Sequence, residues 1–118
     1  MTKEVPKYGA QDILQFVGLN ELPIEEQATV NTLSTEYFEK IKRKLNNVTK
    51  LIVHIKRYQK AGGKPKFSAH VRCIAPTKTL ESCNADDWEL ARCVHKAFED
   101  VIHQIAHVFH TDVSRRTD

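Results

Sequence analysis

The sequence lacks any long apolar run. Uninterrupted apolar stretches such as residues 51–53 fall far short of the roughly 20 residues that span a bilayer. The N-terminal residues 1–9 contain Lys3 and Lys7 but no apolar core of roughly 7 to 15 residues, which a secretory signal requires. We therefore expect no membrane-spanning segment and a cytoplasmic location.

Cysteine and glycine are also scarce. Three cysteines, Cys73, Cys83 and Cys93, are separated by nine residues each, whereas zinc sites usually gather two ligands within a few residues. An odd count in a chain of this size predicts reduced, buried thiols rather than a disulfide framework. With four glycines, the chain has no glycine-rich phosphate loop, and it has neither a nucleophile elbow nor a zinc protease motif. We therefore expect no enzyme activity and no cofactor.

Acidic residues are absent from the middle of the chain. Residues 40–72 contain eleven Lys or Arg and no Asp or Glu, although the net charge of the whole chain is only +3. Because a protein surface normally mixes charges of both signs, this stretch predicts an anionic partner such as nucleic acid. The alternative is a chance excess of surface lysines. Binding to phosphate further requires that these cations converge on one face of the fold, and we expect them to do so.

Alternating apolar residues predict the strands. Residues 13–17 form a short apolar run, and residues 51–55 alternate as in a half-buried strand. Residues 67–73 alternate in the same way after a predicted hairpin turn at residues 62–63, and residues 77–83 predict a weaker fourth strand.

Two segments carry apolar residues at helical spacing. The first begins near Pro23 and has an apolar stripe formed by Val30, Leu33, Tyr37, Ile41 and Leu45. The second opens at Asp86, which forms the sequence pattern of a capping box with Glu89. Its predicted buried stripe consists of Trp88, Ala91, Val94, Phe98, Val101, Ile105 and Val108.

The order of these elements predicts an α+β fold of the form β-α-β-β-β-α. A four-stranded, mostly antiparallel sheet would bury one face under two helices, because sheet and helix each have a single apolar face. A chain of 118 residues suits one such domain. We expect the domain to span residues 12–110, after a flexible N-terminal segment 1–11 and before a C-terminal tail 111–118.

In this order of elements the chain resembles the ribosome hibernation-promoting factors and the related short ribosome-associated inhibitor proteins. The similarity runs over residues 12–109. Within residues 37–56, an aromatic pair is followed by Lys40 and Ile41, by Leu45 and Val48, and by a strand ending in Lys56, at the spacing of the family. Asp86-Asp87-Trp88 at the start of the last helix and Gln104-Ile105 within it are further matches.

The resemblance implies a domain that lodges in the channel of the small ribosomal subunit where mRNA and tRNA bind, and so blocks translation without catalysis. It carries Lys40 and Lys56 over as rRNA-contacting residues. The local charge pattern adds others. The predicted RNA-binding residues are Lys40, Lys42, Arg43, Lys44, Lys50, Lys56, Arg57, Lys66 and Arg72.

The last helix departs from the family pattern. The family's helix is usually rich in lysine near its end, whereas this chain has His103, His107 and His110 beside Glu99 and Asp100. This difference argues against RNA contact by the helix at neutral pH.

Three alternatives stay open. A double-stranded RNA-binding domain shares the order helix, three strands, helix, but it would hold phosphate at the start of the last helix, where this chain has carboxylates. A metal-binding module could use Glu99, His103 and His107, which are one helical turn apart but lack a fourth ligand. A protein-interaction module, including a homodimer, could use an open sheet edge.

On the second strand Tyr58 could stack on an unpaired base, or simply pack on a neighbour.

Overall fold

The computed structural model describes residues 13–45, 48–59, 63–76, 78–82 and 85–117, with side chains as far as Val108. The predicted N-terminal segment 1–11, Cys83 and part of the predicted hairpin turn lie outside these ranges. The elements are β1 (Leu14–Val17), the 3-10 helix η1 (Leu19–Glu21), α2 (Ile24–Lys44), β2 (Lys50–Tyr58), β3 (Lys66–Ala75), β4 (Lys78–Glu81), β5 (Ala85–Asp87) and α3 (Leu90–Thr117).

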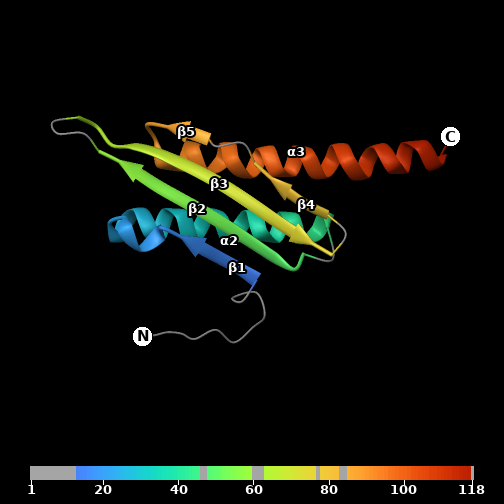
Figure 1. The fold of residues 1–118 in the computed structure, drawn as a ribbon, viewed down its shortest axis with the longest axis horizontal. Helices are drawn as coiled ribbons and strands as arrows, with labels where there is room; N and C mark the ends of the chain where they lie inside the picture. The colour runs from blue at the N-terminus through green and yellow to red at the C-terminus, as the bar shows by residue number, and fades with distance from the viewer. Residues whose placement is uncertain (1–12, 46–47, 60–62, 77, 83–84, 118) are drawn as a thin grey trace.

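The predicted α+β fold is confirmed. The strands follow the order β1-β2-β3-β4, with β1 parallel to β2 and the other neighbours antiparallel. Both helices pack on the same face of this sheet, so the fold has two layers (Figure 1). A fifth strand, β5, was not predicted, because its three residues, one alanine and two aspartates, show no apolar alternation.

Strand β3 is long enough to take two short partners along one edge. β4 pairs with residues 72–75 of β3, and β5 pairs with residues 67–69. Between β4 and β5, Ser82 makes the hydrogen bonds to β3 that a strand residue would make. Its backbone N–H donates to the Val71 carbonyl and its Oγ accepts from the Val71 N–H, both at 2.9 Å. This edge of β3 is therefore hydrogen-bonded from residue 67 to residue 75.

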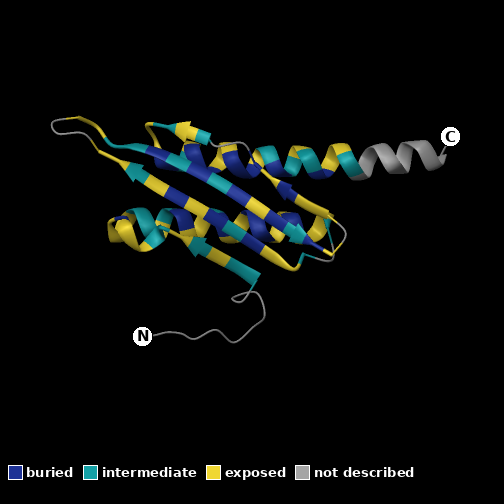
Figure 2. Ribbon diagram, viewed as in Figure 1, coloured by how far each residue is buried: buried dark blue, intermediate teal, exposed yellow. Residues whose placement is uncertain are grey.

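The core lies between the sheet and the helices. Burial alternates along β2 and β3, whose inward side chains meet the apolar stripes of both helices (Figure 2). Cys73 of β3 and Cys93 of α3 are part of this core as free thiols, and burial raises the pKa of each to about 11. Both thiols are therefore protonated at neutral pH, as the sequence predicts for structural cysteines.

The predicted start of α3 is wrong in detail. Asp86 does not cap the helix, because it belongs to β5 and pairs with Ser68 of β3. Instead, the Asp87 Oδ1 accepts a hydrogen bond from the Glu89 N–H at 3.0 Å, and the Glu89 carbonyl accepts the first helical bond from Cys93. Trp88, predicted to lie on the buried stripe, is consequently 58% exposed.

The end of α3 also differs from the prediction. The helix continues to Thr117, through most of the predicted tail at residues 111–118, and extends beyond the end of the sheet (Figure 1).

Asp87 gives the stability of this region a defined pH dependence. Its carboxylate lies 2.8 Å from Lys96 Nζ and 3.3 Å from Arg92 Nε, and with the Glu89 N–H these groups lower its pKa to about 2. Since the unfolded pKa is higher, close to 4, this stabilisation is complete above about pH 4 and is lost as the pH falls towards about 2.

We expect the Asp87→Asn variant to lose less stability than the parent protein between about pH 4 and about pH 2. Urea unfolding at a series of pH values measures this difference. Thr32→Ala, which changes an exposed, uncharged side chain of α2, is the control and keeps the parent's pH profile. An identical profile for Asp87→Asn would contradict the assignment.

Candidate nucleic-acid interface

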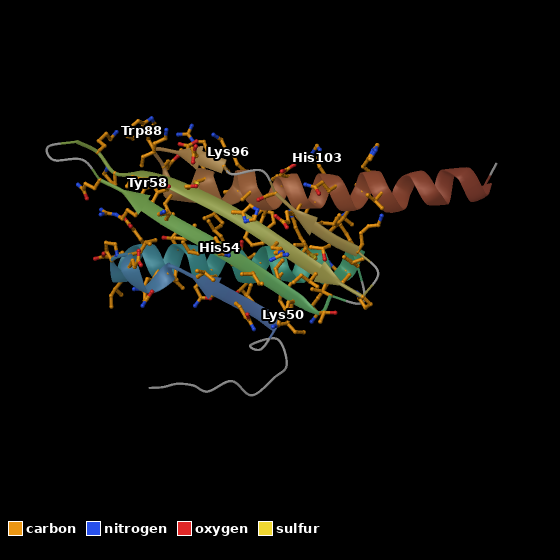
Figure 3. The ribbon with its side chains drawn as sticks, in the orientation of Figure 1. Lys50, His54, Tyr58, Trp88, Lys96 and His103 are labelled. Atoms are coloured by element: carbon orange, nitrogen blue, oxygen red, sulfur yellow. The ribbon has the colours of Figure 1, made fainter. Side chains whose placement is uncertain are left out.

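Four of the predicted RNA-binding residues lie on the side of the sheet that the helices leave uncovered, here called the open sheet face. Lys50 and Lys56 of β2 alternate with the buried residues of that strand, and Lys66 and Arg72 do the same on β3. The residues of the two central strands on this face are Lys50, Ile52, His54, Lys56, Tyr58, Lys66, Ser68, His70, Arg72 and Ile74. Lys50, His54 and Tyr58 mark its extent along β2 in Figure 3.

Three other predicted residues lie on the helix side of the molecule. Lys40, Arg43 and Lys44, near the end of α2, line a depression of about 380 Å³ together with Glu99 and Ile102 of α3. This depression is here called the helix groove. Lys40 Nζ lies 5.1 Å from the centre of the Tyr37 ring, which fixes the cation at the groove wall.

The remaining two predicted residues belong to neither group. Lys42 Nζ lies 5.4 Å from the centre of the Phe38 ring, and Lys42 is not among the groove-lining residues. Arg57 is directed to the helix side of the sheet, where its Nε lies 3.2 Å from Glu26 Oε1 of α2.

The expectation that these cations share one face is therefore wrong. Residues 40–44 form the C-terminal end of α2 in the helix layer. The basic residues from Lys50 to Arg72 that the structure places lie on or next to β2 and β3, the two central strands of the sheet. The stretch of the sequence that contains basic but no acidic residues thus passes from the helix layer to the sheet. Within the strands, alternation then separates Arg57 from Lys56.

Most of these cations are available to an external anion. Arg57 is paired with Glu26, and Arg72 Nε lies 3.3 Å from Glu81 Oε2 of β4. The other seven predicted residues form no ion pair with a carboxylate in the described part of the chain.

Two histidines occupy the centre of the open sheet face. The rings of His54 and His70 meet edge to face across β2 and β3 with their centres 5.9 Å apart, and His70 Nε2 lies 3.1 Å from Glu81 Oε1. Next to them is a hollow of about 440 Å³ lined by Val17, Gly18, Glu21, His54, Ile55, Lys56, Tyr58, Ser68 and His70. Glu81 offsets positive charge here, so the strongest unpaired charge on this face belongs to its lysines.

The structure does not bring the metal-ligand candidates into a site. The Glu99 Oε2 accepts a hydrogen bond from the Tyr37 hydroxyl at 2.8 Å, while His103 and His107 are exposed on α3. Burial and the neighbouring Glu99 carboxylate raise the pKa of Tyr37, so this hydroxyl remains a donor at neutral pH. No three His, Cys, Asp or Glu side chains in the described ranges are grouped closely enough to hold a metal ion.

Sequence reasoning missed one feature of the surface. Trp88 and Lys64 lie with Tyr58 and Lys66 around a pocket at the end of the sheet near the connection between β2 and β3 (Figure 3). The spacing of Trp88 from Ala91 fits a helix and therefore predicts a place on the buried stripe of the last helix. Only the pairing of β5 with β3 places it on the surface.

Comparisons with known proteins add no assignment to this geometry. No protein-family model matches the chain, and no curated protein matches it. Within the described residues, neither helix combines the length and the apolar character needed to cross a membrane.

Proposed function

We propose that this protein is a ribosome-associated dormancy factor, which binds rRNA of the small subunit in the mRNA and tRNA channel and blocks translation. The observation that carries the proposal is that both layers of a two-layer fold present cations without an ion-pair partner among the described residues. Lys40, Arg43 and Lys44 lie on the helix side, and Lys50, Lys56 and Lys66 lie on the open sheet face. The role requires no chemistry by the protein.

Because the cations do not converge on one face, the proposal no longer depends on a single RNA-binding surface; cations on both sides favour a partner that surrounds the domain. A protein lying on a single RNA surface needs positive charge on one face, whereas a domain within an RNA-lined channel meets phosphates on several sides. Each phosphate contact releases condensed counterions, so the contacts of the two faces add to one salt-dependent affinity. The two residues carried over from the family resemblance, Lys40 and Lys56, lie on opposite faces and agree with this mode of binding.

The double-stranded RNA-binding alternative has less support. That mode would direct phosphate to the start of α3, where the positive end of the helix dipole lies. In this chain Asp87 lies there and already holds Arg92 and Lys96, and Glu89 forms a second ion pair with Arg92 at 3.0 Å. Carboxylates at this position repel phosphate.

Sedimentation with purified small ribosomal subunits tests the proposal. We expect the protein to travel with the subunits at about 50 mM salt, and its affinity to fall roughly a thousandfold or more at about 200 mM salt. Bound protein should also displace a fluorescent mRNA fragment from the subunits, because both occupy the same channel.

Large subunits and a duplex RNA are the controls. Duplex RNA bound as tightly as small subunits would favour the double-stranded RNA-binding alternative. A protein that stays at the top of the gradient even in dilute buffer would reject the proposal, as would binding without displacement of mRNA.

A further inference from the structure

One end of the open sheet face forms a pocket of about 590 Å³, here called the aromatic pocket. It is lined by Tyr58, Gly63, Lys64, Lys66, Asp86 and Trp88. Tyr58 is 49% exposed and Trp88 is 58% exposed, although both are large enough to contribute strongly to a core. Two exposed aromatic rings around one concave surface are typical of a binding site.

Each aromatic ring of the pocket has a lysine beside it. Lys66 Nζ lies 5.4 Å from the centre of the Trp88 ring, and Lys56 Nζ lies 5.5 Å from the centre of the Tyr58 ring. Neither lysine, nor Lys64 at the pocket wall, forms an ion pair with a carboxylate in the described ranges. A ligand that stacks on these rings therefore finds cations within reach for a phosphate.

Asp86 adds hydrogen-bond acceptors to the same pocket. Its backbone carbonyl accepts from Lys96 Nζ at 3.2 Å, but no residue in the described part of the chain donates to its carboxylate. This exposed carboxylate lies in the same pocket as Lys64 and Lys66 and would disfavour an isolated phosphate there. It suits a ligand that also offers N–H donors.

We propose that the aromatic pocket binds one unpaired guanine nucleotide of RNA. The base stacks on Trp88 and Tyr58, while the adjoining phosphates contact the lysines. The two Asp86 carboxylate oxygens accept parallel hydrogen bonds from guanine N1–H and N2–H, and guanine is the one standard base with two adjacent donors on its pairing edge. The inference rests on the proposed RNA-binding function and names the element of RNA that this face recognises.

Trp88 makes the test specific, because it is the chain's single tryptophan. Its fluorescence is recorded while 5′-phosphorylated UUGUU or UUUUU ribonucleotide is added. Stacking quenches the signal, and we expect UUGUU to bind roughly tenfold more tightly than UUUUU. Tyr58→Ala should weaken UUGUU binding roughly tenfold through the loss of stacking. Asp86→Asn should lower the preference for guanine to the part that comes from the stronger stacking of a purine, and this ratio is independent of the general gain in affinity from removing a negative charge.

Two matched variants on α2 serve as controls. Ile24→Ala removes an exposed apolar side chain, and Glu39→Gln removes an exposed carboxylate, both on the helix layer. Neither should change either dissociation constant, and circular dichroism confirms the fold of every variant. Binding of end-labelled UUGUU without quenching of Trp88, or an unchanged guanine preference in Asp86→Asn, would overturn the proposal.

Measuring fluorescence quenching and sedimentation on the same protein distinguishes a failure of this inference from a failure of the proposed function. Sedimentation with small subunits in the absence of quenching rejects the guanine site and leaves ribosome binding intact. Quenching with the expected preference in a protein that fails to sediment with small subunits supports the site and rejects the ribosomal role.

Discussion

The Gly18→Ala variant is expected to lose about 2 to 5 kcal/mol of unfolding free energy. Gly18 connects β1 to η1 with φ of 86° and ψ of −1°, a left-handed conformation that costs a residue with a Cβ about 1 to 2 kcal/mol. An added Cβ would also lie 2.3 Å from the Ile55 carbonyl oxygen of β2. Because that oxygen belongs to the backbone of a central strand, relief requires a shift of the strand.

Urea denaturation followed by circular dichroism measures this loss. Gly63→Ala is the control, since Gly63 is an exposed glycine outside the strands and helices. We expect that control to change stability by less than about 0.5 kcal/mol. A Gly18→Ala variant as stable as the parent would show that β1 does not approach β2 as described.

Replacing Lys40, Arg43 and Lys44 together with glutamine is expected to weaken small-subunit binding about a hundredfold or more at about 50 mM salt. The same loss is expected for a second triple variant, Lys50, Lys56 and Lys66 to glutamine. Each triple removes three phosphate contacts and should lower the slope of log affinity against log salt by about 2 to 3. Sedimentation over a salt series gives both quantities.

The two triples together test whether both faces meet RNA. Loss of binding in one triple only would mean that the protein lies on RNA by a single face, and the channel-lodged mode would then be rejected. Lys78→Gln, an exposed lysine of β4 outside both groups, should leave the salt slope nearly unchanged. All of these side chains lie on the surface, so the fold should keep its stability within about 0.5 kcal/mol per substitution.

The elements with strong apolar periodicity could be predicted from the sequence. Alternation located β2 and β3, and the helical stripe located α2, because in each case one buried face fixes the spacing of apolar residues. β5 gave no such signal, since it is held by backbone pairing to β3 while two of its three side chains are aspartates. The error at the start of α3 followed from this omission.

The candidate site was predicted in its residues but not in its arrangement. A count of charges along the chain contains no information about layers, so the division between helix groove and open sheet face could not be obtained from it. One signal was available: Arg57 has the same parity as the buried Val53 and Ile55, so alternation places it on the helix side. Nothing comparable marks Trp88, whose exposure depends on a long-range strand pair.

Ser82 has a consequence for self-association. Ser82 hydrogen-bonds to β3 in the space between β4 and β5. With these two strands it provides backbone partners along one edge of β3, the longest strand that the structure describes. β1 and β4, at the two ends of the strand order, have only four residues each. Short outer strands offer few backbone groups to a foreign strand. These features limit the strand edge of β3, β1 and β4 that is open to intermolecular β-pairing.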